Sequence, residues 1–134
     1  MTIATILSSF LFVAILTVHY EVVRRTVLLG NGGGIARFAI LCAVLLGLHL
    51  AEVLILAGGL EFGRAIGIGR FEKPDEASFM DIYYFALATY STLGLGKVMP
   101  QGHLAFVAGV GSFCGFLAIS MSASALFQVV NSDD

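Results

Sequence analysis

The sequence predicts an all-α membrane protein with three membrane-spanning helices and one shorter helix that enters the membrane without crossing it. Of the 134 residues, 58% are hydrophobic and only 12% are charged, a balance unlike that of a soluble domain. Three apolar stretches, at about 3–23, 36–58 and 103–130, lack the periodic polar positions of a soluble helix. Each is long enough to cross a bilayer, which takes about 20 residues.

Charge and cysteine content narrow the function classes. The net charge of −2 at pH 7 argues against nucleic-acid binding. Cys42 and Cys114 lie inside apolar stretches, where cysteine behaves as a small hydrophobic residue, and nothing in the sequence supports a disulfide between them. The sequence shows no nucleophile with a nearby base and no cluster of metal ligands, so it does not predict an enzyme.

The first apolar stretch is predicted to span the membrane rather than to be a cleaved signal peptide. No Lys or Arg precedes it, and no small-residue cleavage site follows it. Arg24 and Arg25 come after it instead. Glu21 lies four residues before Arg25, a spacing at which an ion pair stabilises a helix by roughly 0.2–0.5 kcal/mol.

Residues 30–34 read Gly-Asn-Gly-Gly-Gly and predict a flexible connection between two helices. They do not predict a phosphate-binding loop, because no strand precedes them and no Lys-Ser or Lys-Thr pair follows. Arg24, Arg25 and Arg37 flank this connection, and the positive-inside rule places such a loop in the cytoplasm. We therefore expect a multi-pass protein of the cell membrane with its N-terminus outside and its C-terminus in the cytoplasm.

His49 and Glu52 are the unusual residues of the second apolar stretch. Ionisable groups inside a membrane helix are costly and tend to be paired or functional, and the three-residue spacing puts these two on one helix face. The sequence favours a buried polar clasp that fixes helix packing. A proton site or a metal site is the alternative, but a metal needs a third ligand and none is evident. His19, near the end of the first apolar stretch, is expected at the membrane interface, with a partnership with this pair as the alternative.

A polar, glycine-rich loop is predicted over about 59–78, outside the membrane, and a short helix over about 79–91. Ser78 or Asp75 would cap this helix. The helix is too short to span and is therefore predicted to be re-entrant, with Tyr83, Tyr84 and Phe85 wedged against the surrounding helices. Its C-terminal end would present the partial negative charge of the helix dipole to the segment that follows.

That segment is Thr-Leu-Gly-Leu-Gly at 92–96. Gly94 and Gly96 can take positive φ values, which would point successive carbonyls the same way, and Thr92 would add a hydroxyl. Non-helical backbone at membrane depth must line a cavity or be buried in protein. A turn with no ion path is the alternative.

The last apolar stretch contains Gly109, Gly111 and Gly115 in its first half, which predicts close packing and bending. Ser120 and Ser124 in its second half suit a helix with one face toward water. Ordinary packing through small residues is the alternative, and the sequence does not separate the two.

The segment 92–96, with the re-entrant helix before it and Pro100 after it, resembles the selectivity filter of the potassium-channel superfamily, usually Thr-Val-Gly-Tyr-Gly. The order of elements over about 37–130 resembles the two-helix pore-loop unit of small bacterial ion-channel-domain proteins. The resemblance divides the chain into an extra N-terminal helix with its glycine-rich loop at 1–35, a channel domain at 36–130 and a short polar tail at 131–134.

The resemblance also implies a function, which is passive conduction of K⁺, with Na⁺ or another monovalent cation as the alternative, and with no organic cofactor. One chain supplies one filter strand, so a pore implies a homotetramer in the lipid bilayer. A non-conducting pore-loop subunit or sensor is the second hypothesis, and a membrane enzyme or proton-coupled carrier around His49 and Glu52 is a third and weaker one. The resemblance implies that carbonyl ligands for the ion come from Thr92, Leu93, Gly94, Leu95 and Gly96, and that Lys97 lies at the outer mouth. It implies pore-helix positions for Tyr84, Phe85, Ala88 and Ser91. It implies an inner-helix hinge or pore lining for Gly109, Gly111, Gly115, Ser120 and Ser124.

Three residues depart from the family pattern. Leu95 stands where an aromatic residue usually braces the filter, and Ala88 and Lys97 stand where many members have a pair of carboxylates. These departures predict a less firmly braced and less selective filter. Lys97 either adds positive charge to the mouth or pairs with Asp81 or Glu76.

Overall fold

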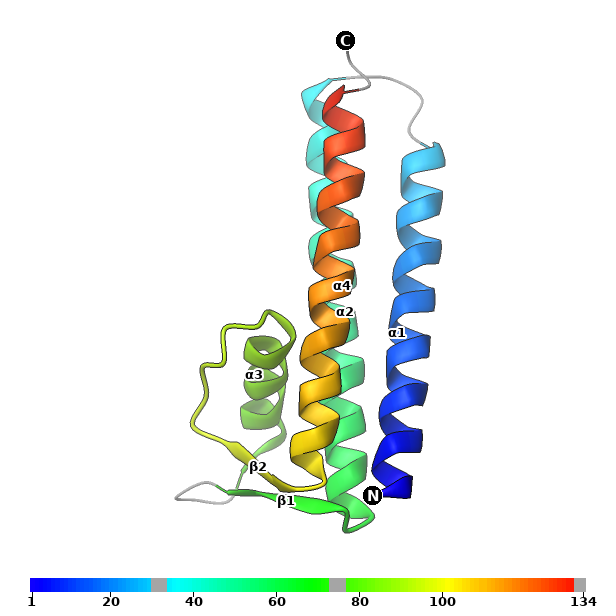
Figure 1. Ribbon diagram of the computed structural model, residues 1–134. Helices are drawn as coiled ribbons and strands as arrows, with labels where there is room; N and C mark the ends of the chain where they lie inside the picture. Colours follow the sequence, from blue (N-terminus) through cyan, green and yellow to red (C-terminus); the bar gives the residue numbers. More distant parts are fainter. Residues whose placement is uncertain (30–33, 73–76, 132–134) are drawn as a thin grey trace.

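The computed structural model describes residues 1–29, 34–72 and 77–131. Within them, three helices are long and apolar enough to cross a membrane, and they lie side by side with a shorter helix and a two-stranded sheet at one end (Figure 1). This confirms the predicted fold class. The elements in order are α1 (Thr2–Leu29), α2 (Ile35–Ala65), β1 (Gly69–Glu72), α3 (Phe79–Tyr90), β2 (Met99–Gly102) and α4 (Leu104–Asn131).

The three long helices alternate in direction. In Figure 1, α1 and α4 run upward, α2 runs downward, and the two termini lie at opposite ends of the bundle. The strands lie at the same end as the N-terminus. An odd number of crossings thus puts the two ends of the chain on opposite sides of a membrane.

Helix α3 is re-entrant, as predicted, and its start is fixed by a capping box. The Ser78 hydroxyl accepts a hydrogen bond from the Asp81 backbone at 3.2 Å, and the Asp81 carboxylate accepts one from the Ser78 backbone at 2.9 Å. This reciprocal arrangement satisfies two N–H groups that a helix start leaves without partners. The chain then turns after Tyr90 and returns to β2 at the same end of the bundle (Figure 1). The other predicted cap, Asp75, lies outside the described residues.

The prediction of a loop over 59–78 is wrong in its first half. Helix α2 continues to Ala65, through Gly59 and Gly63. A Cβ on Gly59 would meet the Leu11 side chain of α1, and one on Gly63 would meet Leu104 of α4. Glycine is therefore required here by close helix packing, which outweighs its low helix propensity.

The second half of that stretch holds a strand that the sequence did not predict. β1 pairs antiparallel with β2, from Gly69 opposite Gly102 to Glu72 opposite Met99. The Gln101 side chain also donates to the Glu72 carboxylate at 2.7 Å. This two-stranded sheet joins the segment before α3 to the segment after the 92–96 loop, and it fixes both ends of the re-entrant unit.

The core lies where α1, α2, α3 and α4 meet. Two contacts bring α4 close to its neighbours, because a Cβ on Gly111 would collide with Leu56 of α2, and one on Gly115 would collide with the backbone of Tyr90 in α3. Helix α1 packs along both α2 and α4, with Phe12 stacked on Phe113 at 5.9 Å between ring centroids. The extra N-terminal helix is thus an integral part of the bundle.

Candidate functional site

The loop at 92–96 is attached to the end of α3 through backbone hydrogen bonds. The N–H groups of Leu93 and Gly94 both donate to the Ala88 carbonyl, at 2.9 and 3.1 Å, and that of Thr92 donates to Thr89 at 3.0 Å. The last carbonyls of α3 therefore bind the loop backbone. Their partial negative charge is directed at the start of the loop, as the helix dipole predicts.

The backbone of the loop takes two left-handed conformations. Thr92 has φ 61° and Gly94 has φ 66°. The prediction for Gly94 is confirmed, whereas the one for Gly96 is wrong, because Gly96 does not have a positive φ. A threonine rarely adopts positive φ, and such strain concentrates at functional sites. The two left-handed residues lie two positions apart, on either side of Leu93.

The loop is fixed at its end and free in its middle. Gly96 lies against Phe85 of α3, which in turn packs edge-on against Phe71 of β1 with 5.9 Å between ring centroids. Val98 is buried, but Leu93 and Leu95 are 67% and 70% exposed. Non-helical backbone at membrane depth must line a cavity or be buried in protein.

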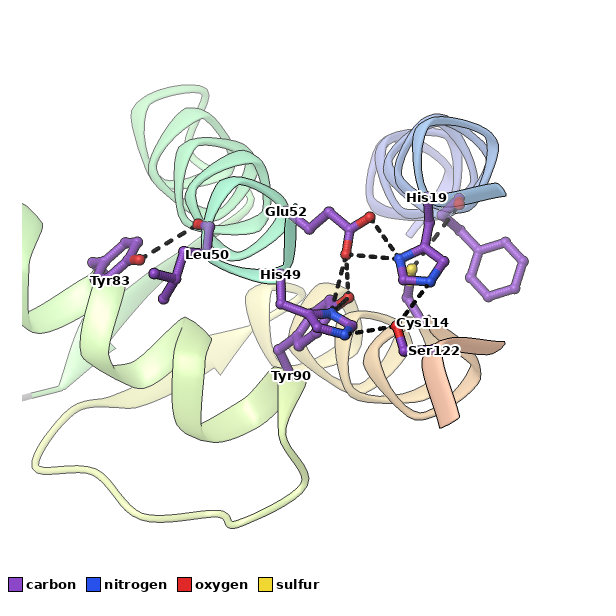
Figure 2. A network of polar contacts seen from close by, with 9 residues as sticks. His19, His49, Leu50, Glu52, Tyr83, Tyr90, Cys114 and Ser122 are labelled. Atoms are coloured by element: carbon purple, nitrogen blue, oxygen red, sulfur yellow. Dashed lines mark hydrogen bonds and ion pairs between the residues drawn. The ribbon is translucent and has the colours of Figure 1, made fainter. Parts of the chain in front are cut away.

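The predicted pore-helix residues have different environments. Ala88 is buried, and Ser91 donates its hydroxyl to the Leu87 carbonyl at 2.8 Å. Tyr83 reaches α2, where its hydroxyl donates to the Leu50 carbonyl at 3.4 Å (Figure 2). Tyr84 is 61% exposed on this chain, so its predicted role as a wedge against surrounding helices stays a prediction.

The outer-mouth and inner-helix candidates lie largely on the surface of the chain. Lys97 is exposed, and among the described residues it makes no ion pair with a carboxylate. A Cβ on Gly109 would meet nothing within 4 Å, unlike one on Gly111 or Gly115. Ser120 donates to the Phe116 carbonyl of its own helix at 2.7 Å. Ser124 lines a groove between α1 and α4.

A second site, which the sequence only partly indicates, is a buried polar cluster between the four helices (Figure 2). His19 of α1 and Glu52 of α2 are fully buried, and His19 Nδ1 lies 3.0 Å from Glu52 Oε1. The Tyr90 hydroxyl, at the end of α3, donates to Glu52 Oε2 at 2.5 Å. An ionised carboxylate only accepts hydrogen bonds, so the phenol supplies the hydrogen of this contact.

His49 and Ser122 close the cluster into a ring. His49 Nδ1 lies 3.1 Å from the Tyr90 oxygen and 3.4 Å from Glu52 Oε2. The Ser122 oxygen of α4 lies 3.0 Å from His49 Nε2 and 3.2 Å from His19 Nε2. Each of the four helices thus contributes at least one side chain, and Tyr90 connects the ring to the residues just before the 92–96 loop.

Two expectations about this cluster are corrected. The prediction of His19 at the membrane interface is wrong, because His19 is buried against Glu52, and the alternative of a partnership with this pair is confirmed. A third metal ligand beside His49 and Glu52 is not evident in the sequence, but His19 supplies one. Candidate ligand atoms of the three residues lie within 4.8 Å of one another. The sequence signal is weak because His19 and Glu52 are 33 residues apart and meet only when α1 packs on α2.

Comparisons with known proteins agree with this architecture. Residues 39–132, more than half of the chain, match the family described as "Ion channel". The chain is 33% identical over 57 residues to the inward rectifier potassium channel Kirbac3.1 of Paramagnetospirillum magnetotacticum. That match covers 42% of this chain and 19% of that protein. No solved structure matches the chain. The chain therefore belongs to the ion channel family.

Proposed function

We propose that four copies of this chain form a pore that conducts K⁺, or another monovalent cation, passively through the carbonyls of residues 92–96. The main support is the backbone of the loop, with positive φ at Thr92 and Gly94 and with the N–H groups of Leu93 and Gly94 fixed on Ala88. Because these N–H groups are bound to α3, the carbonyls of the loop are left as the polar groups available to an ion. Rings of such carbonyls replace an ion's hydration shell in channel filters.

The chain needs partners to complete such a ring. One loop supplies carbonyls from one side only, and closed cyclic symmetry supplies the rest. Leu93, Leu95 and Tyr84 are all more than half exposed on the re-entrant unit. Neighbouring copies would cover these apolar side chains, and this supports a homotetramer around an axis beside the loop.

The charges of the connection between α1 and α2 support one orientation. Arg24 and Arg25 lie near the end of α1 and both pair with Glu21, and Arg37 lies in the first turn of α2. The positive-inside rule puts this end of the bundle in the cytoplasm. The N-terminus, the two strands and the outer end of the loop would then face the outside (Figure 1).

Potassium flux into liposomes tests the proposal. Wild-type protein, reconstituted with a K⁺ gradient, is expected to conduct, and Gly94→Ala is expected to abolish flux while the tetramer stays assembled. Nothing lies within 4 Å of a Cβ at Gly94, so the substitution acts only through its positive φ, which costs a non-glycine residue about 1–2 kcal/mol.

Gly47→Ala is the matched control, because Gly47 also has nothing within 4 Å but lies inside α2 with ordinary helical geometry. It is expected to conduct like the wild type. Flux through Gly94→Ala equal to that of the control would refute the filter assignment. An assembled wild-type tetramer without flux would favour the non-conducting subunit.

A further inference from the structure

We propose that His19, His49 and Glu52 form a binding site for a divalent transition metal of the Zn²⁺ class, which ties α1 to the channel domain. Histidine and carboxylate are common zinc ligands, and two imidazoles with one carboxylate are a known donor set for this ion. The site goes beyond ion conduction, since it lies among the helices and away from the 92–96 carbonyls.

The hydrogen-bond count of the ring calls for an additional cation. Five side chains form five pairings around the ring, His19–Glu52, Glu52–Tyr90, Tyr90–His49, His49–Ser122 and Ser122–His19. Each pairing needs one hydrogen. Two hydroxyls and two neutral imidazoles supply four, and an ionised carboxylate supplies none. A metal ion between the histidines and Glu52 removes the shortfall and balances the buried carboxylate charge.

The distances from both histidines to the Glu52 carboxylate fit a shared metal. His19 Nδ1 and His49 Nδ1 both face the Glu52 carboxylate, at 3.0 and 3.4 Å. A tetrahedral zinc with bonds of 2.0–2.2 Å holds its ligand atoms about 3.4 Å apart. The Tyr90 hydroxyl lies 2.5 Å from Oε2 of the same carboxylate and 3.1 Å from His49 Nδ1.

The Nε2 atoms of His19 and His49 already have the kind of hydrogen-bond partner that metal-bound histidines require. A metal-bound histidine donates its other N–H to an oriented acceptor. Here both Nε2 atoms lie on one oxygen, that of Ser122, at 3.2 and 3.0 Å. A hydroxyl oxygen has two lone pairs and accepts both hydrogen bonds. With both Nδ1 atoms on a metal, every polar atom of the ring has a partner.

The location of the site indicates what the metal would do. His19 lies on α1, outside residues 39–132 that match the channel family, whereas His49 and Glu52 lie on α2 within them. Tyr90 connects the cluster to the end of α3. A bound metal would therefore fasten the extra helix to the helix pair that positions the loop.

Metal titration of the full-length protein in detergent tests the site without any measurement of flux. After dialysis against a chelator, wild-type protein is expected to bind one Co²⁺ per chain with the visible absorption of a tetrahedral ion, and Zn²⁺ is expected to displace it. His19→Gln and Glu52→Gln are each expected to weaken Zn²⁺ binding by more than about 100-fold, since loss of an outer-shell partner alone costs about 10–100-fold.

His103→Gln is the control, because His103 is the remaining histidine of the sequence and lies at the surface. Its Nε2 atom is 3.0 Å from the N-terminal amine of Met1. It should bind like the wild type. Ser122→Ala keeps all three ligands and should weaken binding about 10–100-fold, which provides a test if a ligand variant does not fold. The proposal would be overturned if wild-type protein bound no Co²⁺, or if His19→Gln bound the metal as tightly as His103→Gln. The fifth hydrogen of the ring would then come from a proton.

Discussion

Gly115→Ala is the substitution whose effect the structure specifies most sharply. A Cβ at Gly115 would overlap the carbonyl of Tyr90 and lie 2.8 Å from Cγ of its ring. These atoms belong to the backbone and to the base of a buried side chain, so none can rotate away. The helices α3 and α4 must separate instead, and overpacking of this kind costs roughly 1–3 kcal/mol. The displacement would also move Tyr90 away from Glu52.

Gly109→Ala on the same helix is the matched control. A methyl group at Gly109 meets nothing within 4 Å, so the change should be neutral or stabilise α4 by up to about 1 kcal/mol through helix propensity. Thermal unfolding of both variants in one detergent compares them. We expect Gly115→Ala to unfold at a clearly lower temperature than Gly109→Ala. Equal unfolding temperatures would refute the close approach of α4 to Tyr90.

Glu52, Ser78 and Lys97 provide three more tests. Glu52→Ala leaves buried hydrogen-bond donors unsatisfied, at roughly 1–3 kcal/mol each, and should lower the unfolding temperature in detergent. An unchanged temperature would mean that the ring of hydrogen bonds around Glu52 does not form. Ser78→Ala removes the cap of α3 and should destabilise the protein by roughly 0.5–2 kcal/mol in the same assay, and a smaller effect would place the helix start elsewhere. Lys97→Asp should raise single-channel conductance, with a gain that shrinks as salt rises, and a gain that is flat with salt would place Lys97 away from the ion path.

The spans and the re-entrant helix are predictable because their signals are local. Continuous apolar runs locate the start of α1 and both ends of α4 to within one residue, although α1 ends at Leu29 and not at the predicted residue 23. Ser78 with Asp81 three residues later marks the start of α3. The Thr-Leu-Gly-Leu-Gly segment indicates the channel family together with the re-entrant helix before it and Pro100 after it. These features depend on composition, spacing and capping, which a single sequence carries in full.

The remaining features depend on contacts between distant residues. The predicted end of α2 is too early because Gly58 and Gly59 suggest a break, and only the approach of Leu11 explains why the helix continues there. The strands β1 and β2 are four residues each, too short for a reliable alternation pattern. The predicted place of His19 is wrong because its partner Glu52 lies on another helix, and nothing near His19 in the sequence indicates that pairing.

The most direct test of the channel assignment is to locate the ion. Crystals of the full-length protein grown with Rb⁺ or Tl⁺ in place of K⁺ would show these heavier ions by anomalous scattering. We expect peaks on a fourfold axis, coordinated by the carbonyls of Thr92, Leu93 and Gly94 from four chains. A fourfold assembly with no peak at these carbonyls, or peaks only elsewhere, would contradict the proposal that this loop is the ion path.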